Sequence, residues 1–492
     1  MNTKGLTEGL VIATFVLAAV LSVGTVGAED VTIGVLYPFS GDLGAYGKPE
    51  TDPMKLAVKE VNENGGVLGG RLKLLIKDTE TSEEVAVTKA HELLDWHNVS
   101  VIIGTASSEA CKAIIGYTTS NGVLQISPSV TGVEFTTYPD NDLFFRTCPS
   151  DALQGIAMAR LAIQQGYKTA STLVVWNPYG EGFEKAFTKE FKMLGGKVLE
   201  SVRYDPDRTT FDSEVEKVAA VNPDFVMLCA YPETGSVILK TAYKKGYMDN
   251  IDWLLSEGLR SDELADMVGK DEAGNYIIAG LKGTTPDPRV VGPAYETFRQ
   301  KYLAEYGKEP EAYGANSYDA VAVVALAIEK AGDASGTAIR DSLRDVANPP
   351  GDKYVSDIGE ALRTIRKGFY SINYQGASGE ITFDEHGDVR GSFCEWTIAD
   401  NGRVVYGNPI ELKGPIVPST PSPKPTVLET PTPTVVETPE PTVAETPTPT
   451  VVETPEPTVA ETPTPTPPGF EVVFAIASLL AVAYSVWRRK RA

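Results

Sequence analysis

The feature that most constrains the fold is a repeated alternation of short apolar runs with longer segments of helical periodicity. Val31 to Tyr37 is a β-branched apolar run, and residues 54–62 then carry apolar side chains at helical spacing before Asn64-Gly65-Gly66 ends the segment. A strand followed by a helix is the repeating unit of a parallel α/β sheet. The first series predicts strands at 31–37, 72–77, 101–103, 123–126 and 143–146, with helices at 54–62, 83–96 and 110–119.

A second series of the same design follows along the chain. It predicts helices at 152–165, 181–194, 211–221 and 234–245, with strands at 171–175, 197–204 and 225–228. Further strands are expected at 253–255, 276–281, 394–399 and near Ile381, with helices at 295–306, 317–330 and 336–346. The sequence therefore predicts an α/β protein of two doubly wound parallel-sheet lobes. Open parallel sheets bind ligands at the carboxyl ends of their strands, so we expect a cleft between the lobes.

Residues 1–28 have the pattern of a signal peptide. An apolar run from Leu10 to Val23 is followed by the small residues Val26-Gly27-Ala28, which a signal peptidase reads. We expect cleavage after Ala28 and export of the remainder, with an uncleaved anchor helix as the alternative. Export makes Asn98, in Asn98-Val99-Ser100, a candidate for N-glycosylation.

Residues 415–468 predict a disordered, extended stalk. They hold 17 of the 34 prolines, and the 16-residue unit at 431–446 recurs unchanged at 447–462. Alternating prolines remove backbone hydrogen-bond donors and favour a polyproline-like conformation. The composition is therefore incompatible with a packed core.

Residues 469–492 predict a membrane anchor or a sorting signal. An apolar stretch to Trp487 is followed by Arg488-Arg489-Lys490-Arg491, which the positive-inside rule places in the cytoplasm. A permanent transmembrane helix is one interpretation. The Thr/Pro-rich spacer, Pro468-Gly469-Phe470, the short apolar segment and the basic end also resemble the archaeal PGF-CTERM sorting signal. That resemblance implies an archaeosortase that replaces the helix with a lipid. Either way we expect a tether to the outer face of the membrane.

Charge and composition exclude several classes of function. With 44 Lys and Arg against 66 Asp and Glu, the net charge is −22, which excludes nucleic acid as a partner. Three His and four Cys without a C-x-x-C pair leave no metal site of ordinary spacing. The glycine-rich segment from Gly41 to Lys48 lacks phosphate-loop spacing, and no G-x-S-x-G motif is present. Nothing in these patterns argues for an enzyme, which stays an open alternative, and we expect no cofactor.

Hydroxyl and aromatic side chains, with one acid, follow the predicted strands. They are Tyr46, Ser107, Ser108, Ser127, Ser129, Thr131, Tyr179, Tyr231, Glu257 and Tyr318. Serine hydroxyls and backbone N–H groups at a helix start suit a carboxylate, while an acid with neutral acceptors suits an ammonium. The set therefore fits a zwitterion. The alternative is that the Ser and Thr residues only cap helices.

From Val31 to Leu412 the sequence resembles the branched-chain amino-acid-binding proteins of ABC importers, which have the type I periplasmic-binding fold. The matching motifs are Ser40-Gly41, Tyr46-Gly47, Asn64-Gly65-Gly66-Val67, Ile103-Gly104, Ser127-Pro128-Ser129 with Thr131, Tyr179-Gly180-Glu181-Gly182, Glu257-Gly258, Ser317-Tyr318-Asp319-Ala320 and Gly379-Glu380-Ile381-Thr382-Phe383-Asp384. We expect residues 29–147 with 283–383 in one lobe and 148–282 with 384–412 in the other. A hinge of three segments near Cys148, Lys282 and Asp384 would join them.

The resemblance implies a set of ligand contacts. Ser108 and the backbone N–H of Thr131 would hold the ligand carboxylate. The Ser129 carbonyl, the Thr131 hydroxyl and Glu257 would hold its ammonium. Tyrosines would line the pocket from both lobes, namely Tyr46, Tyr179, Tyr231 and Tyr318. An α-amino acid is the favoured ligand, although members of this fold also bind amides, urea and aromatic acids.

Cysteine usage departs from the family. Members with a disulfide near the binding loop have Cys where this chain has Ser107, whereas here Cys111 lies one helical turn further. Cys111 and Cys148 are a candidate disulfide pair, although spacing does not fix connectivity. Cys229, within an apolar strand, is expected to be a buried free thiol. The region from Arg363 to Gly376 is assigned no role.

The resemblance implies a binding protein and not an enzyme. The protein would capture an amino acid between its lobes and deliver it to ABC permease subunits in the membrane. Two alternatives remain open, a ligand-sensing ectodomain and a structural cell-surface protein on the same fold.

Overall fold

The computed structural model describes residues 29–289, 292–368 and 371–414. The expected signal peptide at 1–28, the stalk at 415–468 and the C-terminal segment at 469–492 lie outside the described residues. Within the described ranges, no helix has the length and apolar character needed to cross a membrane.

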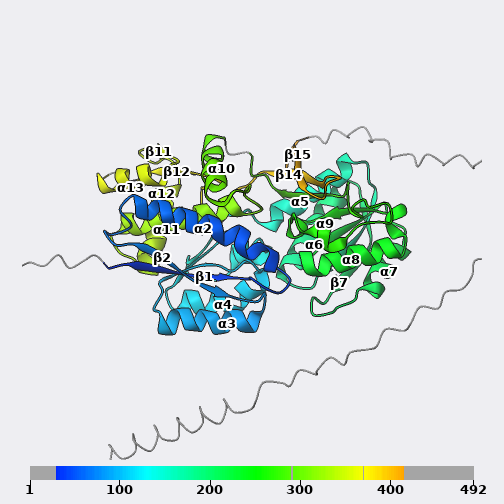
Figure 1. Ribbon diagram of the computed structural model, residues 1–492, viewed down its shortest axis with the longest axis horizontal. Coiled ribbons are helices and arrows are strands. Elements are labelled where there is room, and N and C mark those ends of the chain that lie inside the picture. The colour runs from blue at the N-terminus through cyan, green and yellow to red at the C-terminus, as the bar shows by residue number, and fades with distance from the viewer. Residues whose placement is uncertain (1–28, 290–291, 369–370, 415–492) are drawn as a thin grey trace, which may run out of the picture. The chain divides into compact units, whose positions relative to one another are not determined.

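A five-stranded parallel sheet forms the core of the first lobe (Figure 1), with strand order β2-β1-β3-β4-β5. The strands are β1 (Val31–Tyr37), β2 (Leu72–Asp78), β3 (Val101–Gly104), β4 (Leu124–Ser127) and β5 (Phe144–Arg146). Helices α2 (Gly47–Glu63) and α11 (Gly314–Ala331) cover one face, and α3 (Glu83–His91) and α4 (Ser108–Ser120) cover the other. Because both faces are covered, β3, β4 and β5 are buried at every position.

The C-terminal part of the first lobe packs around α11. It comprises α10 (Pro293–Tyr306), α12 (Gly336–Ala347), α13 (Ile358–Arg366), β11 (Tyr354–Val355), β12 (Asn373–Gly376) and β13 (Gly379–Glu380). The buried carboxylate of Asp319 on α11 accepts hydrogen bonds from the Tyr374 hydroxyl at 3.0 Å, the Ala377 N–H at 2.9 Å and the Ser378 N–H at 2.7 Å. These bonds fix the β12–β13 hairpin against the helix.

A seven-stranded sheet forms the core of the second lobe, with strand order β15-β14-β10-β9-β8-β6-β7. The strands are β6 (Thr169–Val175), β7 (Lys197–Tyr204), β8 (Phe225–Cys229), β9 (Asp252–Leu255), β10 (Lys282–Pro286), β14 (Phe393–Ile398) and β15 (Val404–Ile410). The pairs β10–β14 and β14–β15 are antiparallel, and the other neighbouring strands are parallel. The helices are α5 (Asp151–Gln164), α6 (Pro178–Met193), α7 (Asp212–Ala220), α8 (Pro232–Lys244) and α9 (Leu264–Val268).

Three connections between the lobes follow β5, β10 and β13, as expected for a three-segment hinge. The second connection includes residues 290 and 291, which lie outside the described ranges. The second crossing corrects one expected boundary. Residue 283 was placed in the first lobe, but β10 runs to Pro286 and pairs with β9 and β14 of the second sheet. The chain therefore returns to the first lobe only after Pro286.

The strand expected at 276–281 is wrong. Residues 277–281 form turns, with Ala279 N–H donating to the Tyr276 carbonyl at 3.0 Å and Leu281 N–H donating to the Ile278 carbonyl at 3.1 Å. Gly280 has a φ of 85°, which ends any extended run. The strand starts instead at Lys282. Helix α13 and strand β12 lie in the region from Arg363 to Gly376 and its flank, which the sequence reasoning left without a role.

A buried ion pair ties β5 to the third connection. Arg146 is fully buried, and its Nε and Nη2 each donate to Asp388 at 2.7 Å. Its Nη1 also donates to the Gly132 carbonyl at 2.8 Å, in the loop that follows β4. The Arg146 guanidinium thus connects the loop that follows β4 to a hinge segment.

We expect the substitution Asp388→Ala to lower the free energy of unfolding by about 3–5 kcal/mol, because it leaves a buried guanidinium without its counter-charge. Chemical denaturation checks this. The matched control is Glu305→Ala, which removes the pair with Lys59 from an exposed carboxylate on α10 and should cost less than about 1 kcal/mol. Equal losses for the two variants would contradict this role for Asp388.

Candidate functional site

A small cavity, of about 30 Å³, lies at the carboxyl ends of strands from both sheets. Seven of the eight predicted ligand-binding residues line it, namely Tyr46, Ser108, Ser129, Thr131, Tyr179, Tyr231 and Glu257. The first four follow β1, β3 and β4, and the last three follow β6, β8 and β9. The two sheets therefore supply opposite walls of one site, as expected for open parallel sheets.

Hydroxyl groups form the wall on the side of the first lobe. Ser107 is the cap of α4, and its Oγ accepts from the Ala110 N–H at 3.3 Å. Ser108 has a different role, because its Oγ accepts from the Gly132 N–H at 3.2 Å. Its own proton is left to point at an acceptor in the cavity. The start of α4 adds the positive end of a helix dipole at the same place.

Aromatic rings form most of the wall on the side of the second lobe. Tyr179, at the start of α6, and Tyr231, just before α8, stack with their ring centroids 5.5 Å apart and their planes 9° apart. The Asn177 side chain donates to the Tyr231 hydroxyl at 3.1 Å, and the Gly258 N–H donates to the Tyr179 hydroxyl at 3.2 Å. The rings are thus held in one orientation.

Glu257 places a carboxyl group in the cavity wall and is 2 % exposed. Its Oε2 accepts from Nε2 of Gln154 at 2.6 Å, and the same amide also donates to the Thr284 carbonyl at 3.0 Å. Burial raises the pKa of Glu257, while its hydrogen bonds lower it. The sequence analysis did not identify Gln154, because this residue lies within a predicted helix and belongs to no recognised motif.

A second acid, Asp151 at the start of α5, lies fully buried near Glu257. Within the described part of the chain, neither of its carboxyl oxygens has a hydrogen-bond partner. Burial raises the pKa of Asp151, and the negative charge of Glu257 raises it further. Two carboxyl groups thus stand together in a region whose lining contains no Lys or Arg among the described residues. The two neighbouring carboxyl groups therefore favour a bound cation over a bound anion.

Tyr46 joins the two lobes across the cavity. Its hydroxyl lies 3.0, 3.1 and 3.2 Å from the carbonyl oxygens of Glu257, Gly258 and Arg260. The side chain is 5 % exposed. Because one proton serves three acceptors on the turn that carries Glu257, this contact defines a closed arrangement of the lobes.

The prediction for Tyr318 is wrong. Its side chain is buried in the core of the first lobe, 5.1 Å from the ring of Phe298, and does not line the cavity. Tyr313, at the start of the same helix, lines it instead. Tyr313 has a φ of 57°, unusual for a non-glycine residue, and the conformation places it at the wall.

Glu50 on α2 is a lining residue that the sequence analysis missed. It is 1 % exposed, and its Oε2 accepts from the Tyr37 hydroxyl at 2.7 Å. The Tyr37 hydroxyl also lies 3.2 Å from Oγ of Ser129. Burial raises the pKa of Glu50 to about 8. In the sequence, only the neighbouring apolar residues of the helix indicate that Glu50 is buried, and they do not indicate that it lines a cavity.

The candidate disulfide between Cys111 and Cys148 is absent, and both are free buried thiols. Cys111 Sγ lies 3.3 Å from Nε2 of Gln125, whereas Cys148 Sγ donates to the Val130 carbonyl at 3.4 Å. Each thiol is engaged with its own neighbour. Cys229 is buried and free, as predicted. Asn98 is exposed, and its glycosylation stays a prediction.

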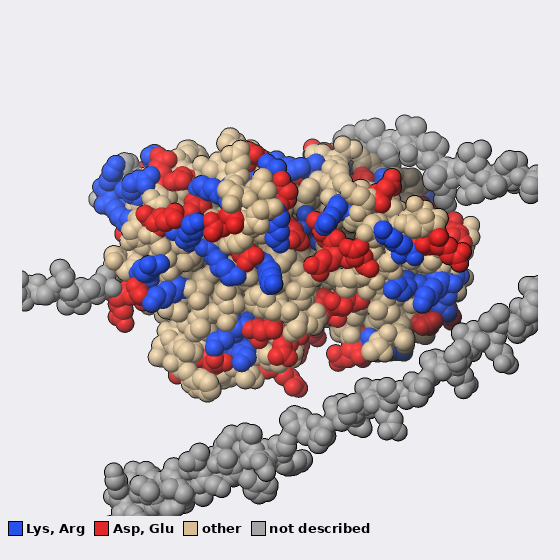
Figure 2. Space-filling view, viewed as in Figure 1, with Lys and Arg blue, Asp and Glu red and all other residues tan. Residues whose placement is uncertain are grey.

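An acidic groove adjoins the cavity. Its lining includes Asp42, Glu109, Asp207 and the 61 % exposed Trp176, and it shares Tyr231 with the cavity. Figure 2 shows Asp and Glu side chains gathered on both sides of the hollow in the lower middle of the view. Burial, together with neighbouring carboxylates, raises the pKa of Asp42 to about 6 and that of Glu109 to about 7. The groove presents negative potential to an approaching solute.

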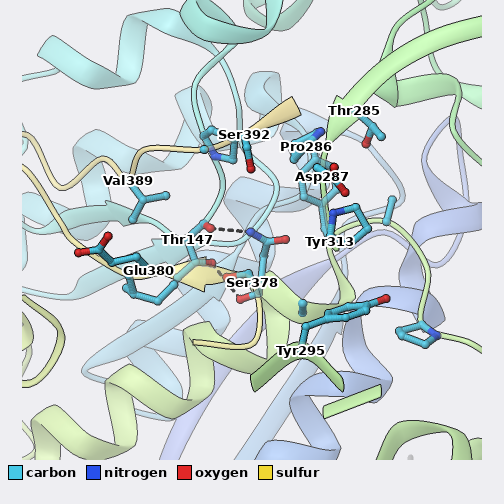
Figure 3. Close-up of a pocket in the computed structure, with 18 of the residues that line it drawn as sticks. Thr147, Thr285, Pro286, Asp287, Tyr295, Tyr313, Ser378, Glu380, Val389 and Ser392 are labelled. Carbon is cyan, nitrogen blue, oxygen red and sulfur yellow. Dashed lines mark hydrogen bonds between the residues drawn. The ribbon is translucent and has the colours of Figure 1, made fainter. Parts of the chain in front are cut away.

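A second cavity, of about 40 Å³, lies at the hinge (Figure 3). Its lining draws on all three connecting segments, including Thr147, Asp287 and Ser392. Tyr313 lines both this hinge cavity and the central one. The Tyr313 side chain is therefore a shared wall between the two cavities.

The raised pKa of Glu50 predicts a pH dependence of stability. The folded protein keeps a proton up to about pH 8 that an unfolded Glu, with an ordinary pKa of 4.5, loses earlier. This contribution is therefore complete below about pH 4.5 and is lost as pH rises toward 8. Relative to the parent, Glu50→Gln should gain stability as pH rises over that range, by at most about 1.4 kcal/mol per pH unit.

Urea denaturation at several pH values measures the difference between Glu50→Gln and the parent. Glu272→Gln, at an exposed position in a turn of the second lobe, is the control and should give a flat difference. A flat difference for Glu50→Gln as well would show that Glu50 titrates normally.

Comparison with known proteins places this fold among binding proteins. Residues 30–367 match the family model described as periplasmic binding protein, and residues 468–490 match the PGF-CTERM motif. The family consists of substrate-binding proteins, not enzymes. Together the two matches indicate an exported protein anchored at the cell surface.

Individual relatives agree with the family match. The chain is 27% identical over 372 residues to the chemotactic signal transduction system substrate-binding protein BasB of Halobacterium salinarum, covering 72% of this chain and 83% of that one. It is 28% identical to Leu/Ile/Val-binding protein homolog 1 of Brucella abortus, covering 76% and 91%. The leucine-binding protein LivK of Thermotoga maritima superposes with a TM-score of 0.66 at 27% identity, covering 77% and 98%. The chain belongs to the periplasmic binding protein family and has its type I fold.

Proposed function

We propose that the protein captures an α-amino acid, with a branched-chain side chain favoured, between its two lobes and delivers it to an ABC permease. The observation that carries this proposal is the convergence of hydroxyls from one lobe with Glu257 and stacked tyrosines from the other on one cavity. The similarity to a leucine-binding protein and to Leu/Ile/Val-binding proteins supports the ligand class.

The two charged ends of an amino acid match the two walls. The carboxylate accepts from the Ser108 hydroxyl and from backbone N–H groups at the start of α4. The ammonium donates to Glu257, the Thr131 hydroxyl and the Ser129 carbonyl, with Asp151 adding negative charge behind them. The Tyr179 and Tyr231 rings offer an apolar surface to the side chain.

Charge favours this class over the other ligands known for the fold. Aromatic acids carry a negative charge without an ammonium, so the acidic groove and the buried Glu257 disfavour them. Urea and amides would leave the Glu257 charge without a counter-ion.

Delivery to a permease requires that the lobes open and close. The Tyr46 hydroxyl bonds to the Glu257 turn only when the lobes are together, so closure and the ammonium site share one contact. A permease that recognises both lobes at once distinguishes loaded from empty protein in this way. The surface anchor keeps the protein beside its membrane partner.

We expect Glu257→Gln to weaken binding of leucine, isoleucine or valine by about 30-fold or more, equivalent to about 2–5 kcal/mol, because the ligand ammonium loses its buried counter-charge. Isothermal calorimetry measures the affinities. The exposed Glu272→Gln variant should match the parent. Unchanged affinity in Glu257→Gln would reject the assigned ammonium site, and no binding of any α-amino acid to the parent protein would reject the proposed ligand class.

A second candidate is solute sensing for a signalling partner. The observation that favours it is the similarity to BasB, a substrate-binding protein of a chemotactic signal transduction system. Binding chemistry would be the same, and only the membrane partner would differ. Deleting the gene in its host distinguishes the two, since loss of labelled amino-acid uptake supports import and loss of a behavioural response with normal uptake supports sensing.

A further inference from the structure

Arg260 is a buried guanidinium with two unused donors. The residue is 5 % exposed and lies on the turn that carries Glu257. Its Nη2 donates to the Tyr406 hydroxyl, but Nε and Nη1 have no hydrogen-bond partner in the part of the chain that the structure describes. Buried polar groups are paired in nearly all native proteins, so each unpaired one requires an explanation.

The positive charge of Arg260 also lacks a carboxylate partner. No ion pair within 4.0 Å joins it to an acid among the described residues. The acids nearby are engaged elsewhere, Asp262 with Arg403 at 3.8 Å, Glu311 with Lys308 at 3.0 Å and Asp287 with Arg289 at 2.9 Å. An uncompensated buried charge is strongly unfavourable, which favours a counter-ion from outside the chain.

Arg260 lines an open groove between the lobes. Three other arginines line the same groove, Arg289, Arg299 and Arg403, together with Tyr295 and Tyr406. The lining also holds four acids, Asp262, Glu296, Glu309 and Glu311, so its formal charge is zero. The other three arginines are paired, Arg289 with Asp287, Arg299 with Glu296 and Glu309, and Arg403 with Asp262. Arg260 is the one guanidinium of these four without a carboxylate partner.

The groove concentrates positive charge around one aromatic ring. The guanidinium carbons of Arg260 and Arg289 lie 5.0 and 5.5 Å from the ring centroid of Tyr406. The Tyr406 hydroxyl accepts from Arg260 Nη2, so its own proton is free to donate to an acceptor at the same place. Tyr295, which Figure 3 labels in the neighbouring hinge cavity, lines the groove from the first lobe.

We propose that Arg260, with the Tyr406 hydroxyl, binds a small oxyanion, such as phosphate or a carboxylate, in this groove. Oxyanions bind guanidinium N–H groups strongly and supply the counter-charge that Arg260 lacks. The site is separate from the central cavity and does not depend on which solute that cavity takes.

An anion bound at Arg260 would stabilise the closed arrangement of the lobes, because Arg260 lies on the turn where the lobes meet. The Arg260 N–H donates to the Glu257 carbonyl at 2.8 Å, and the Arg260 carbonyl lies 3.2 Å from the Tyr46 hydroxyl. An anion that neutralises Arg260 therefore stabilises the turn on which the two lobes meet. Solute affinity should rise with the same anion, because the two bound states share this turn.

The test is thermal melting of the full-length protein, without amino acid, in phosphate, sulfate, acetate or chloride at one ionic strength. We expect at least one of the three oxyanions to raise the melting temperature above the chloride value, with the effect saturating as its concentration rises. A preference for phosphate or for acetate tells inorganic from carboxylate ligands. Equal melting temperatures in all four salts would overturn the proposal.

Single substitutions test whether the oxyanion binds at Arg260 and Tyr406. Arg260→Met should weaken oxyanion binding at least tenfold, and in chloride it should be as stable as the parent or more stable, because the uncompensated charge is gone. Arg299→Met, in the same groove but at a paired arginine, should bind within about twofold of the parent. If Arg260→Met does not fold, Tyr406→Phe should weaken binding severalfold. An oxyanion effect that survives either Arg260→Met or Tyr406→Phe unchanged would also overturn the proposal.

Discussion

Buried carboxyl groups at a cavity whose described lining contains no Lys or Arg are the constraint on which the site depends. Glu257 and Glu50 line the central cavity, Asp151 lies behind it, and the described lining contains no Lys or Arg. Burial raises the pKa of all three, which records the cost of holding negative charge there. The ammonium of the proposed ligand would lower that cost at Glu257 and Asp151. The imbalance that makes the region unfavourable for the protein alone would thus favour a cationic group.

The parallel sheets explain why these groups meet. Each lobe presents the carboxyl ends of its strands to the cleft, so short loops after β3 and β4 face short loops after β6, β8 and β9. Tyr46 then connects the lobes at the Glu257 turn, and Arg260 continues that turn into the neighbouring groove. Ligand recognition, lobe closure and the proposed anion site therefore share four consecutive residues.

Sequence reasoning recovered what depends on local pattern. Strand β1, a largely buried apolar run, and the edge strand β7, which is mostly exposed or half-buried, were both predicted with their observed bounds. Residues directly after strands, such as Ser108, Tyr231 and Glu257, line the cavity as expected. Sequence reasoning failed where helix packing decides orientation. Tyr318 and Glu50 both sit on helices, and only the packing of α11 and α2 against the sheet sends one into the core and the other to the cavity. The turn at Gly280 and the pairing of Gln154 with Glu257 arise from tertiary contacts that no local pattern encodes.

Recognition of both ends of a zwitterion is the central claim, and calorimetry with matched leucine analogues tests it most directly. The purified protein would be titrated with the best-binding branched-chain amino acid, with the acid that lacks its ammonium and with the amine that lacks its carboxylate. The account predicts that loss of either charged group weakens binding by about 100-fold or more, since each leaves buried polar partners unpaired. Binding of the acid as tightly as the amino acid would contradict it.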